Sequence, residues 1–346
     1  MNTNTKVRVA IIGLSMGSYH LSILKKNPQA EVVALCDLKE DLVQILAKQN
    51  DVPKALTHYQ DVIADPTVDA MVIALPVYLH APVTIAALNA GKHVLVEKPM
   101  AMTSIDAQEM LDTARKNKVI LAIHHNQRFD PETVFLKEYI KQGNLGFVHF
   151  TRCVWTRPYG VLPDTSRNWF NEKDKGGGVL FDLGTHLLDK ILALFDFPEA
   201  VQFAASSFTV LGKEQERLTG ARFDADDLSV GMIQFANGMT LQLEMGFGSH
   251  IEREILYYEL YGEKGGVNTL GGMKIFSAMQ GTPFITKPAR DLPKPTIPTV
   301  TDDFIDAIIN KRPPVVTPES AIIVTKILEG LRNAARKGWG KPGNII

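Results

Sequence analysis

The sequence predicts an α/β protein of two domains: a doubly wound parallel sheet, then a C-terminal α/β domain with a large open, mostly antiparallel sheet. In the first third, apolar segments of strand length alternate with helical patterns, which requires a parallel sheet with right-handed crossovers. Beyond residue 200, strand-like segments follow one another directly, which is typical of antiparallel pairing and leaves one sheet face free. A chain of 346 residues is longer than one hydrophobic core usually supports. We therefore predict two domains, 1–124 and 125–346.

The composition is that of a globular protein with a small-molecule partner. Lysine plus arginine number 37 and aspartate plus glutamate 38, a formal net charge of −1. Such a balance, without long runs of one sign, favours neither nucleic acid nor an anionic membrane as partner. We see no run of membrane-span length and no signal peptide. Cys36 and Cys153 lie in apolar, strand-like segments, so we expect buried thiols and a cytoplasmic location.

A glycine turn follows the first strand. The apolar run Val7–Ile12 ends at Gly13 and leads into a helical pattern, and Asp37 follows the next apolar run at roughly the 20-residue spacing of a Rossmann fold or slightly beyond. This pattern predicts a dinucleotide-binding domain, with Asp37 at the ribose diol. Asp37 favours NAD, although Lys39 leaves NADP open. The pyrophosphate is expected against Gly13, Ser15, Met16 and Gly17.

The turn has a second interpretation. Its spacing is G-x-S-x-G rather than G-x-G-x-x-G, and G-x-S-x-G also describes the nucleophile elbow of α/β-hydrolases, with Ser15 as nucleophile. The first strand is an unusual place for that elbow, and only the dinucleotide interpretation explains Asp37.

Two later strands of the parallel sheet also end in residues suited to a ligand site. The run 68–75 ends at Leu75-Pro76, with His80 close behind, and the strand around 94–96 runs into Glu97-Lys98-Pro99. Ligands of open α/β sheets gather at these carboxyl ends. Pro99 stops the strand and holds Lys98 on a stiff turn, whose peptide bond can be cis or trans.

The second half contains a candidate acid–base pair. Asp182 and His186 lie four residues apart in a predicted helix, 179–194, so their side chains share one face, and the carboxylate can fix the imidazole tautomer. The alternatives are a polar stripe on an amphipathic helix, or a metal site with Asp189 that lacks a compelling third ligand. His124-His125 has no cysteine or acid cluster nearby in the sequence, so we predict no metal.

An irregular segment, 156–171, is the candidate substrate side. It combines aromatic and arginine side chains, a mixture that suits sugars: Arg157, Tyr159, Arg167 and Trp169. Trp155, at the end of the preceding strand, joins Arg157 and Trp169 as a substrate candidate. Elsewhere we expect Ser104 to cap a helix over 104–117, Asn237-Gly238 to form a hairpin, 283–298 to be a proline-rich connector, and 301–309 and 318–337 to be closing helices.

The ordered set of these motifs resembles the Gfo/Idh/MocA family of sugar and cyclitol oxidoreductases. The set comprises the glycine turn, Asp37, Pro76 with His80, the segment 90–99, Arg128, and Gly177-Gly178 before Asp182-Leu183-Gly184-Thr185-His186. The resemblance covers nearly the whole chain. It implies a nicotinamide-dependent dehydrogenase with an N-terminal Rossmann domain, associating as a homodimer or homotetramer through its C-terminal sheet.

The resemblance also implies roles for individual residues. His186 would transfer the proton, Asp182 would orient the His186 ring, and Lys98 would hydrogen-bond the reacting oxygen. The implied cofactor contacts are Gly13, Ser15, Met16, Gly17, Asp37, Leu75, Pro76, His80, Glu97, Lys98 and Arg128, where Arg128 has a structural salt bridge as its alternative. The implied substrate contacts are Lys98, Trp155, Arg157, Trp169, Asp182 and His186.

Two rival functions share this fold. An NAD-dependent glycosidase would oxidise its substrate transiently and recycle its cofactor, so it would release no NADH. A non-catalytic NAD-binding regulator would not need Lys98, Asp182 and His186 together, so their joint presence argues against it.

Overall fold

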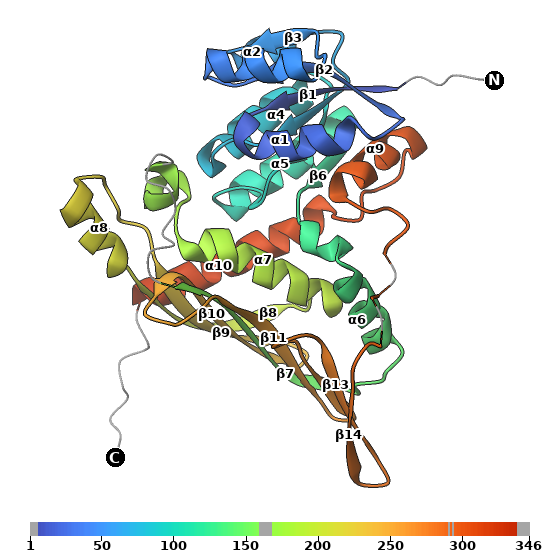
Figure 1. The fold of residues 1–346 in the computed structure, drawn as a ribbon, viewed down its shortest axis with the longest axis vertical. Coiled ribbons are helices and arrows are strands. Elements are labelled where there is room, and N and C mark those ends of the chain that lie inside the picture. The colour runs from blue at the N-terminus through green and yellow to red at the C-terminus, as the bar shows by residue number, and fades with distance from the viewer. Residues whose placement is uncertain (1–5, 159–167, 290, 293, 338–346) are drawn as a thin grey trace. The chain divides into compact units, whose positions relative to one another are not determined.

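The computed structural model describes residues 6–158, 168–289, 291–292 and 294–337 (Figure 1). The chain divides into two compact units, Met1–Phe129 with Thr296–Thr325, and Asp130–Pro295 with Lys326–Ile346. This division differs from the expected single boundary between residues 124 and 125. The segment Thr296–Thr325 returns to the first unit because its apolar side chains, among them Val300, Phe304 and Ile305, are buried in that unit's core.

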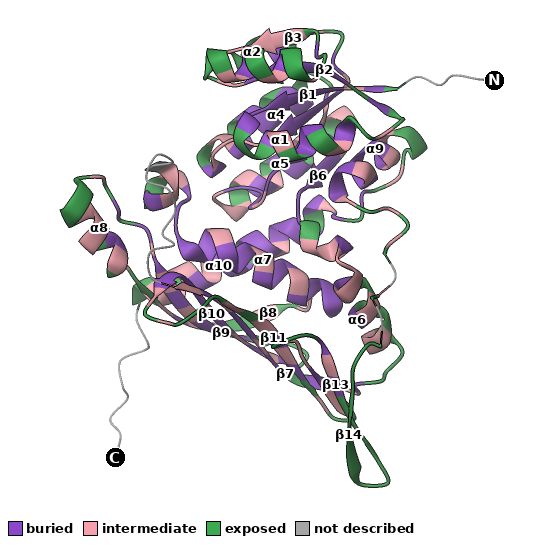
Figure 2. Ribbon diagram, in the orientation of Figure 1, coloured by how far each residue is buried: buried purple, intermediate pink, exposed green. Residues whose placement is uncertain are grey.

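The first unit is built on a six-stranded parallel sheet in the order β3-β2-β1-β4-β5-β6. This is the Rossmann order, and it confirms the predicted doubly wound sheet. Its strands other than the half-buried edge strand β3 are mostly buried and apolar, as a sheet covered on both faces requires (Figure 2). They are β1 Val7–Ile12, β2 Ala30–Cys36, β3 Lys54–Leu56, β4 Ala70–Ile73, β5 His93–Val96 and β6 Leu121–Ile123.

Helices cover both faces of this sheet. They are α1 Leu14–Leu24, α2 Glu40–Gln49, α3 Tyr59–Ala64, α4 His80–Asn89, α5 Ser104–Asn117 and α9 Val300–Asn310, with the short helices η1 Val77–Leu79 and η2 Asn126–Phe129. The N-cap of α5 lies one residue before the expected position. Thr103, not Ser104, is the N-cap, because its Oγ1 accepts the N–H of Asp106 at 3.1 Å.

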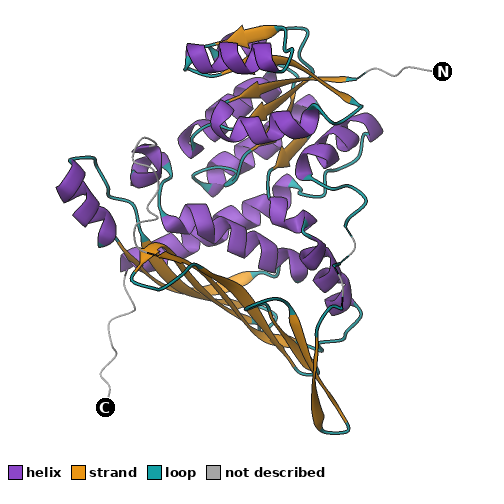
Figure 3. Ribbon diagram, viewed as in Figure 1, coloured by secondary structure: helices purple, strands orange, loops and turns teal. Residues whose placement is uncertain are grey.

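The second unit holds an eight-stranded sheet in the order β14-β13-β12-β11-β7-β10-β9-β8. Figure 3 draws its strands in orange. Only the β7–β10 pair is parallel, so the predicted mostly antiparallel sheet is confirmed. The strands are β7 Val148–Pro158, β8 Ala200–Phe208, β9 Leu228–Phe235, β10 Thr240–Ser249, β11 Ile255–Gly262, β12 Gly265–Asn268, β13 Lys274–Met279 and β14 Thr282–Thr286.

The turns of this sheet confirm one expectation and correct another. Asn237-Gly238 joins antiparallel β9 and β10, with Gly238 at φ 93°. The expected connector 283–298 was wrong at its start, because Pro283 lies within β14. A proline is tolerated there because β14 is the last strand of the sheet and has a free edge.

Helix α7, Val179–Leu194, packs against β7, β9 and β10 on one face of this sheet. Along β9, Ile233 and Phe235 are buried while Met232 and Gln234 are exposed, so the other face is only partly covered. The remaining helices are α6 Pro131–Lys141, α8 Leu211–Thr219, α10 Pro318–Lys337 and the short η3 Asn168–Asn171 and η4 Lys173–Lys175.

Two expectations about single features were also tested. Cys36 and Cys153 are both buried free thiols, as predicted, and burial, with Asp37 and Asp61 nearby, raises the pKa of Cys36 to about 12. Among the described residues, no helix has both the length and the apolar character needed to span a membrane.

Candidate active site

The glycine turn after β1 admits no side chain at Gly13. Its φ is 84°, and a Cβ there would lie 2.3 Å from the carbonyl oxygen of Ala74. Helix α1 begins at the next residue. The carboxylate of Asp37 accepts the N–H of Leu14 at 2.8 Å and the N–H of Lys39 at 3.0 Å, so Asp37 lies at the start of this helix.

The first turn of α1 fits the pyrophosphate of a dinucleotide. Ser15 and Met16 are exposed there, and the N-cap residue, Gly13, has no capping side chain, while Asp37 accepts the N–H of Leu14. The first backbone N–H groups of a helix lack intrahelical partners and meet the positive end of its dipole, which together favour an anion. Gly17 allows α1 to pack closely on β1, because a Cβ would lie 2.7 Å from Cγ2 of Ile11.

The loops after β4 and β5 are joined by His80. Its ring is buried, with Nε2 at 2.8 Å from the carbonyl oxygen of Leu75 and Nδ1 at 2.8 Å from that of Pro99. Burial lowers the pKa of this imidazole. His80 therefore ties together the Leu75-Pro76 segment and the Lys98-Pro99 turn, whose peptide bond is cis.

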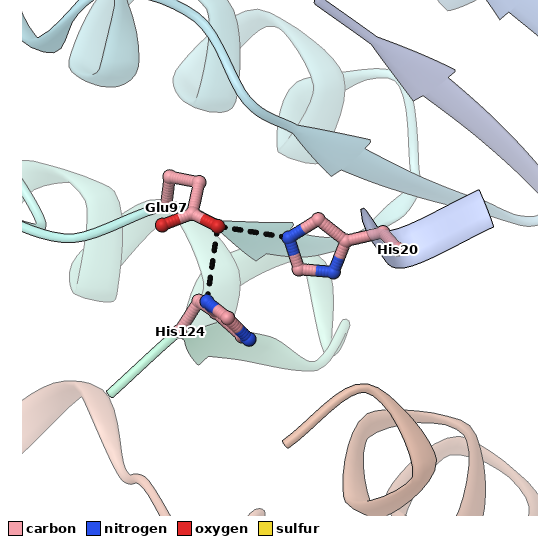
Figure 4. A group of neighbouring side chains, drawn as sticks. All are labelled: His20, Glu97 and His124. Carbon is pink, nitrogen blue, oxygen red and sulfur yellow. Dashed lines mark hydrogen bonds and ion pairs between the residues drawn. The ribbon is translucent and has the colours of Figure 1, made fainter. Parts of the chain in front are cut away.

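The residue before Lys98, Glu97, is buried against two histidines (Figure 4). Its Oε1 lies 2.9 Å from Nε2 of His20 and 2.9 Å from Nδ1 of His124. On the far side of His20, Nδ1 lies 2.9 Å from Oγ1 of Thr301 in α9. The sequence analysis did not associate these residues, because each comes from a different element and no spacing connects them.

Arg128 has a partner within the first unit. Its guanidinium donates to Oγ of Ser320 at 3.0 Å. This contact supports a structural role for Arg128.

In the second unit, Asp182 and His186 lie on successive turns of α7 and both are half-buried. They therefore share one face, as the spacing predicted. The helix starts at Gly178, where φ is 109°, and Oδ2 of Asp226 accepts the N–H of Leu180 at 2.9 Å. Asp226 thus takes the place of an N-cap for the helix that carries the acid–base candidates.

Trp155 and Arg157 extend from β7 beside His186. The ring centroids of Trp155 and His186 are 5.8 Å apart, and the Arg157 guanidinium lies 5.2 Å from the Trp155 ring centroid. Glu254 holds both, accepting the indole N–H at 2.7 Å and Nε–H of Arg157 at 3.4 Å. Sequence reasoning missed Glu254, because one acid in a polar loop carries no distinguishing pattern.

The other substrate candidates are less informative. The ring of Trp169, in η3, stacks on Phe170 at a centroid distance of 3.8 Å, which is a packing contact. Tyr159 and Arg167 lie outside the described residues.

These features define an NAD-binding oxidoreductase with a Rossmann domain. The family model "Oxidoreductase family, NAD-binding Rossmann fold" matches residues 7–125, and the "GFO/IDH/MocA C-terminal domain" matches 133–268. The chain is 30% identical to D-glucoside 3-dehydrogenase of Escherichia coli, with 97% of each chain covered. It belongs to the Gfo/Idh/MocA family.

Two further relatives agree. Levoglucosan dehydrogenase of Pseudarthrobacter phenanthrenivorans is 27% identical over 69% of this chain and 64% of its own. The crystal structure of GenD2 from gentamicin A biosynthesis, in complex with NAD, is 25% identical and superimposes with a TM-score of 0.80, covering 98% of this chain and 97% of that one. The family assignment replaces the hydrolase interpretation of Ser15.

Proposed function

We propose that this protein is an NAD-dependent dehydrogenase that oxidises a secondary alcohol of a sugar, glycoside or inositol, or reduces the corresponding ketone. The observation that carries the proposal is that one chain holds both a dinucleotide-type glycine turn with Asp37, in its first unit, and the Asp182–His186 face of α7, in its second. Relatives named for a D-glucoside and for levoglucosan support glycosides as the first substrates to test.

The residues divide the chemistry between them. NAD, held at the glycine turn and Asp37, would supply the hydride acceptor for the oxidative direction. As hydride leaves the carbon atom, the proton of the hydroxyl group must also leave. A histidine side chain can accept this proton at near-neutral pH. His186 is the proposed acid–base, Asp182 orients its ring, and Lys98 stabilises the charge that develops on the reacting oxygen.

Trp155, Arg157 and Glu254 form the proposed sugar-binding cluster. The indole packs beside His186, so a ligand held here lies next to the proposed acid–base. The Arg157 guanidinium and the outer oxygen of Glu254 retain donors and acceptors for hydroxyl groups. Because the two charges compensate each other, the cluster suits a neutral polyol better than an ionised sugar acid.

The test is NADH formation, followed by its absorbance. The purified protein is given NAD with methyl glucosides, levoglucosan, free aldoses or inositols, and Lys98→Ala is compared with Lys116→Ala, an exposed lysine of α5. Stoichiometric NADH with one substrate class, lost in Lys98→Ala and kept in Lys116→Ala, supports the proposal. Hydrolysis of glycosides without NADH release favours the cofactor-recycling glycosidase, and tight NADH binding without any turnover favours the regulator.

We also propose a cytoplasmic homodimer or homotetramer associated through the partly covered face of the second sheet. Three exposed apolar or aromatic side chains support this surface. Met232 lies in β9, Tyr261 in β11 and Phe276 in β13. In register, these positions lie on the same face of the sheet. A monomer by light scattering would refute this association.

A further inference from the structure

We infer that His20, Glu97, His124 and Thr301 form a buried positioning network, which fixes the peptide between Glu97 and Lys98 and makes helix α9 part of the cofactor unit's active site. The inference rests on the proposed function of Lys98. It concerns residues that do not touch a reacting atom themselves and therefore act through the turn they hold.

The carboxylate of Glu97 is the centre of the network. Oε1 faces both imidazoles at 2.9 Å, and Oε2 accepts the backbone N–H of Lys98 at 3.2 Å. Glu97 is only 6% exposed. A buried carboxylate is costly unless several donors satisfy it, and these donors meet that condition. Burial acts to raise the pKa of Glu97, but His124 and His20 outweigh it and bring this pKa well below its usual range.

The geometry fixes the tautomers of both rings. A carboxylate only accepts hydrogen bonds, so Nε2 of His20 and Nδ1 of His124 must each carry a hydrogen. Nδ1 of His20 is then free to accept the hydroxyl hydrogen of Thr301. Nε2 of His124 is buried without a hydrogen-bond partner among the described residues.

For His20, burial lowers the pKa against the opposing effect of Glu97. The network is therefore centred on the Glu97 carboxylate, which both rings face at 2.9 Å.

Thr301 brings a distant segment into this network. It lies in the first turn of α9, is fully buried, and is 281 residues from His20 in sequence. Beside it, Asn27 donates to the carboxylate of Asp302 at 2.8 Å, which further fixes α9 to the end of α1. The network thus links α1, the ends of β5 and β6, and α9 around one carboxylate.

A metal site is the alternative use of the same atoms. The ligand atoms of His20, Glu97 and His124 lie within 4.8 Å of one another. However, both ring nitrogens are 2.9 Å from one oxygen, the spacing of hydrogen bonds. Ligands of a tetrahedral zinc stand about 3.3 Å apart, given bonds of about 2.0 to 2.1 Å. The observed spacing therefore favours a network closed by protons.

The test uses Thr301→Val, which removes the hydroxyl but keeps the branched shape, and Thr301→Ser, which restores the hydroxyl. The control is Thr325→Val, at a buried threonine whose hydroxyl bonds only within α10 in the described structure. We expect Thr301→Val to lower kcat by about tenfold with an unchanged KM for NAD, because Lys98 is slightly misplaced. Thr301→Ser should recover most of kcat. Equal kcat values in Thr301→Val and Thr325→Val would overturn the inference.

A second measurement needs no substrate and so separates this inference from the proposed function. Nitrogen-15 NMR of the imidazole rings, assigned with His20→Asn and His124→Asn, should show a hydrogen on Nε2 of His20 and on Nδ1 of His124. Absence of a hydrogen from either nitrogen would contradict the network. Uptake of one Zn²⁺ per chain that Glu97→Gln abolishes would assign the cluster to a metal instead.

Discussion

The carboxylate of Asp226 accepts the backbone N–H of Leu180 at 2.9 Å, and the same oxygen accepts the hydroxyl of Ser229 at 2.7 Å. Asp226 precedes β9, so a residue outside α7 orients the helix that carries Asp182 and His186. Replacing Asp226 with alanine should cost about 1 to 2 kcal/mol of stability, as the loss of a helix cap does, and Asp226→Asn should retain the cap because its amide oxygen still accepts.

The two variants should also differ in their dependence on pH. Burial raises the pKa of Asp226 above its unfolded value of about 3.9. Between those two pKa values the folded state binds more protons, so Asp226 makes the protein less stable as pH rises through this window. Asn does not titrate. The melting temperature of Asp226→Asn minus that of the wild type should therefore increase with pH above about 4 and then level off. A flat difference would contradict this.

Gly13 lies in the cofactor turn, and Gly91, which lies outside it, serves as the comparison. Both have positive φ, 84° and 76°, but a Cβ at Gly13 would meet the Ala74 carbonyl at 2.3 Å, whereas Gly91 has nothing within 4 Å. Gly91→Ala should cost only the left-handed backbone strain, about 1 to 2 kcal/mol. Gly13→Ala must in addition displace the start of α1, so NADH affinity should fall by about tenfold or more. Fluorescence titration with NADH measures this, and equal affinities would argue against the assigned turn.

The sequence predicted the parts of the site that depend on local patterns. The end of β1, the turn at Gly13 and the position of Asp37 follow from strand periodicity and spacing, and so does the shared face of Asp182 and His186. Each of these signals lies within one element or at its end, where geometry is set by neighbouring residues.

Long-range associations were not predictable in this way. Thr301 meets His20 only because α9 returns to the first unit, and Glu254 meets Trp155 only because β11 pairs with β7. Each of these side chains is ordinary in its own segment. The strands β12 to β14 were missed for a related reason, since they are short, β12 begins with two glycines and β14 contains Pro283.

Glu254 should affect substrate binding more than cofactor binding. Glu254→Leu removes the acceptor for the Trp155 indole and the charge that holds Arg157, so we expect KM for the sugar to rise by about tenfold, the value of one charged hydrogen bond. Glu254→Gln keeps an oxygen that can accept the indole N–H, so its KM for the sugar should lie between those of the wild type and Glu254→Leu. Glu252→Leu, at an exposed neighbour, is the control. Steady-state kinetics check this, and an unchanged sugar KM in Glu254→Leu would exclude the cluster from substrate binding.

Asp37 should determine the choice between NAD and NADP. Its carboxylate accepts the N–H groups of Leu14 and Lys39, which hold it at the start of α1. There its charge would repel a 2′-phosphate, and Lys39 would attract one once that charge is removed. Asp37→Asn keeps an acceptor for the turn, so we expect the ratio of kcat/KM for NADP to that for NAD to increase by about tenfold or more. Asp41→Asn, at an exposed acid in the first turn of α2, should leave the ratio unchanged. If Asp37→Asn lowers activity with both cofactors equally, Asp37 serves the fold of the turn rather than cofactor choice.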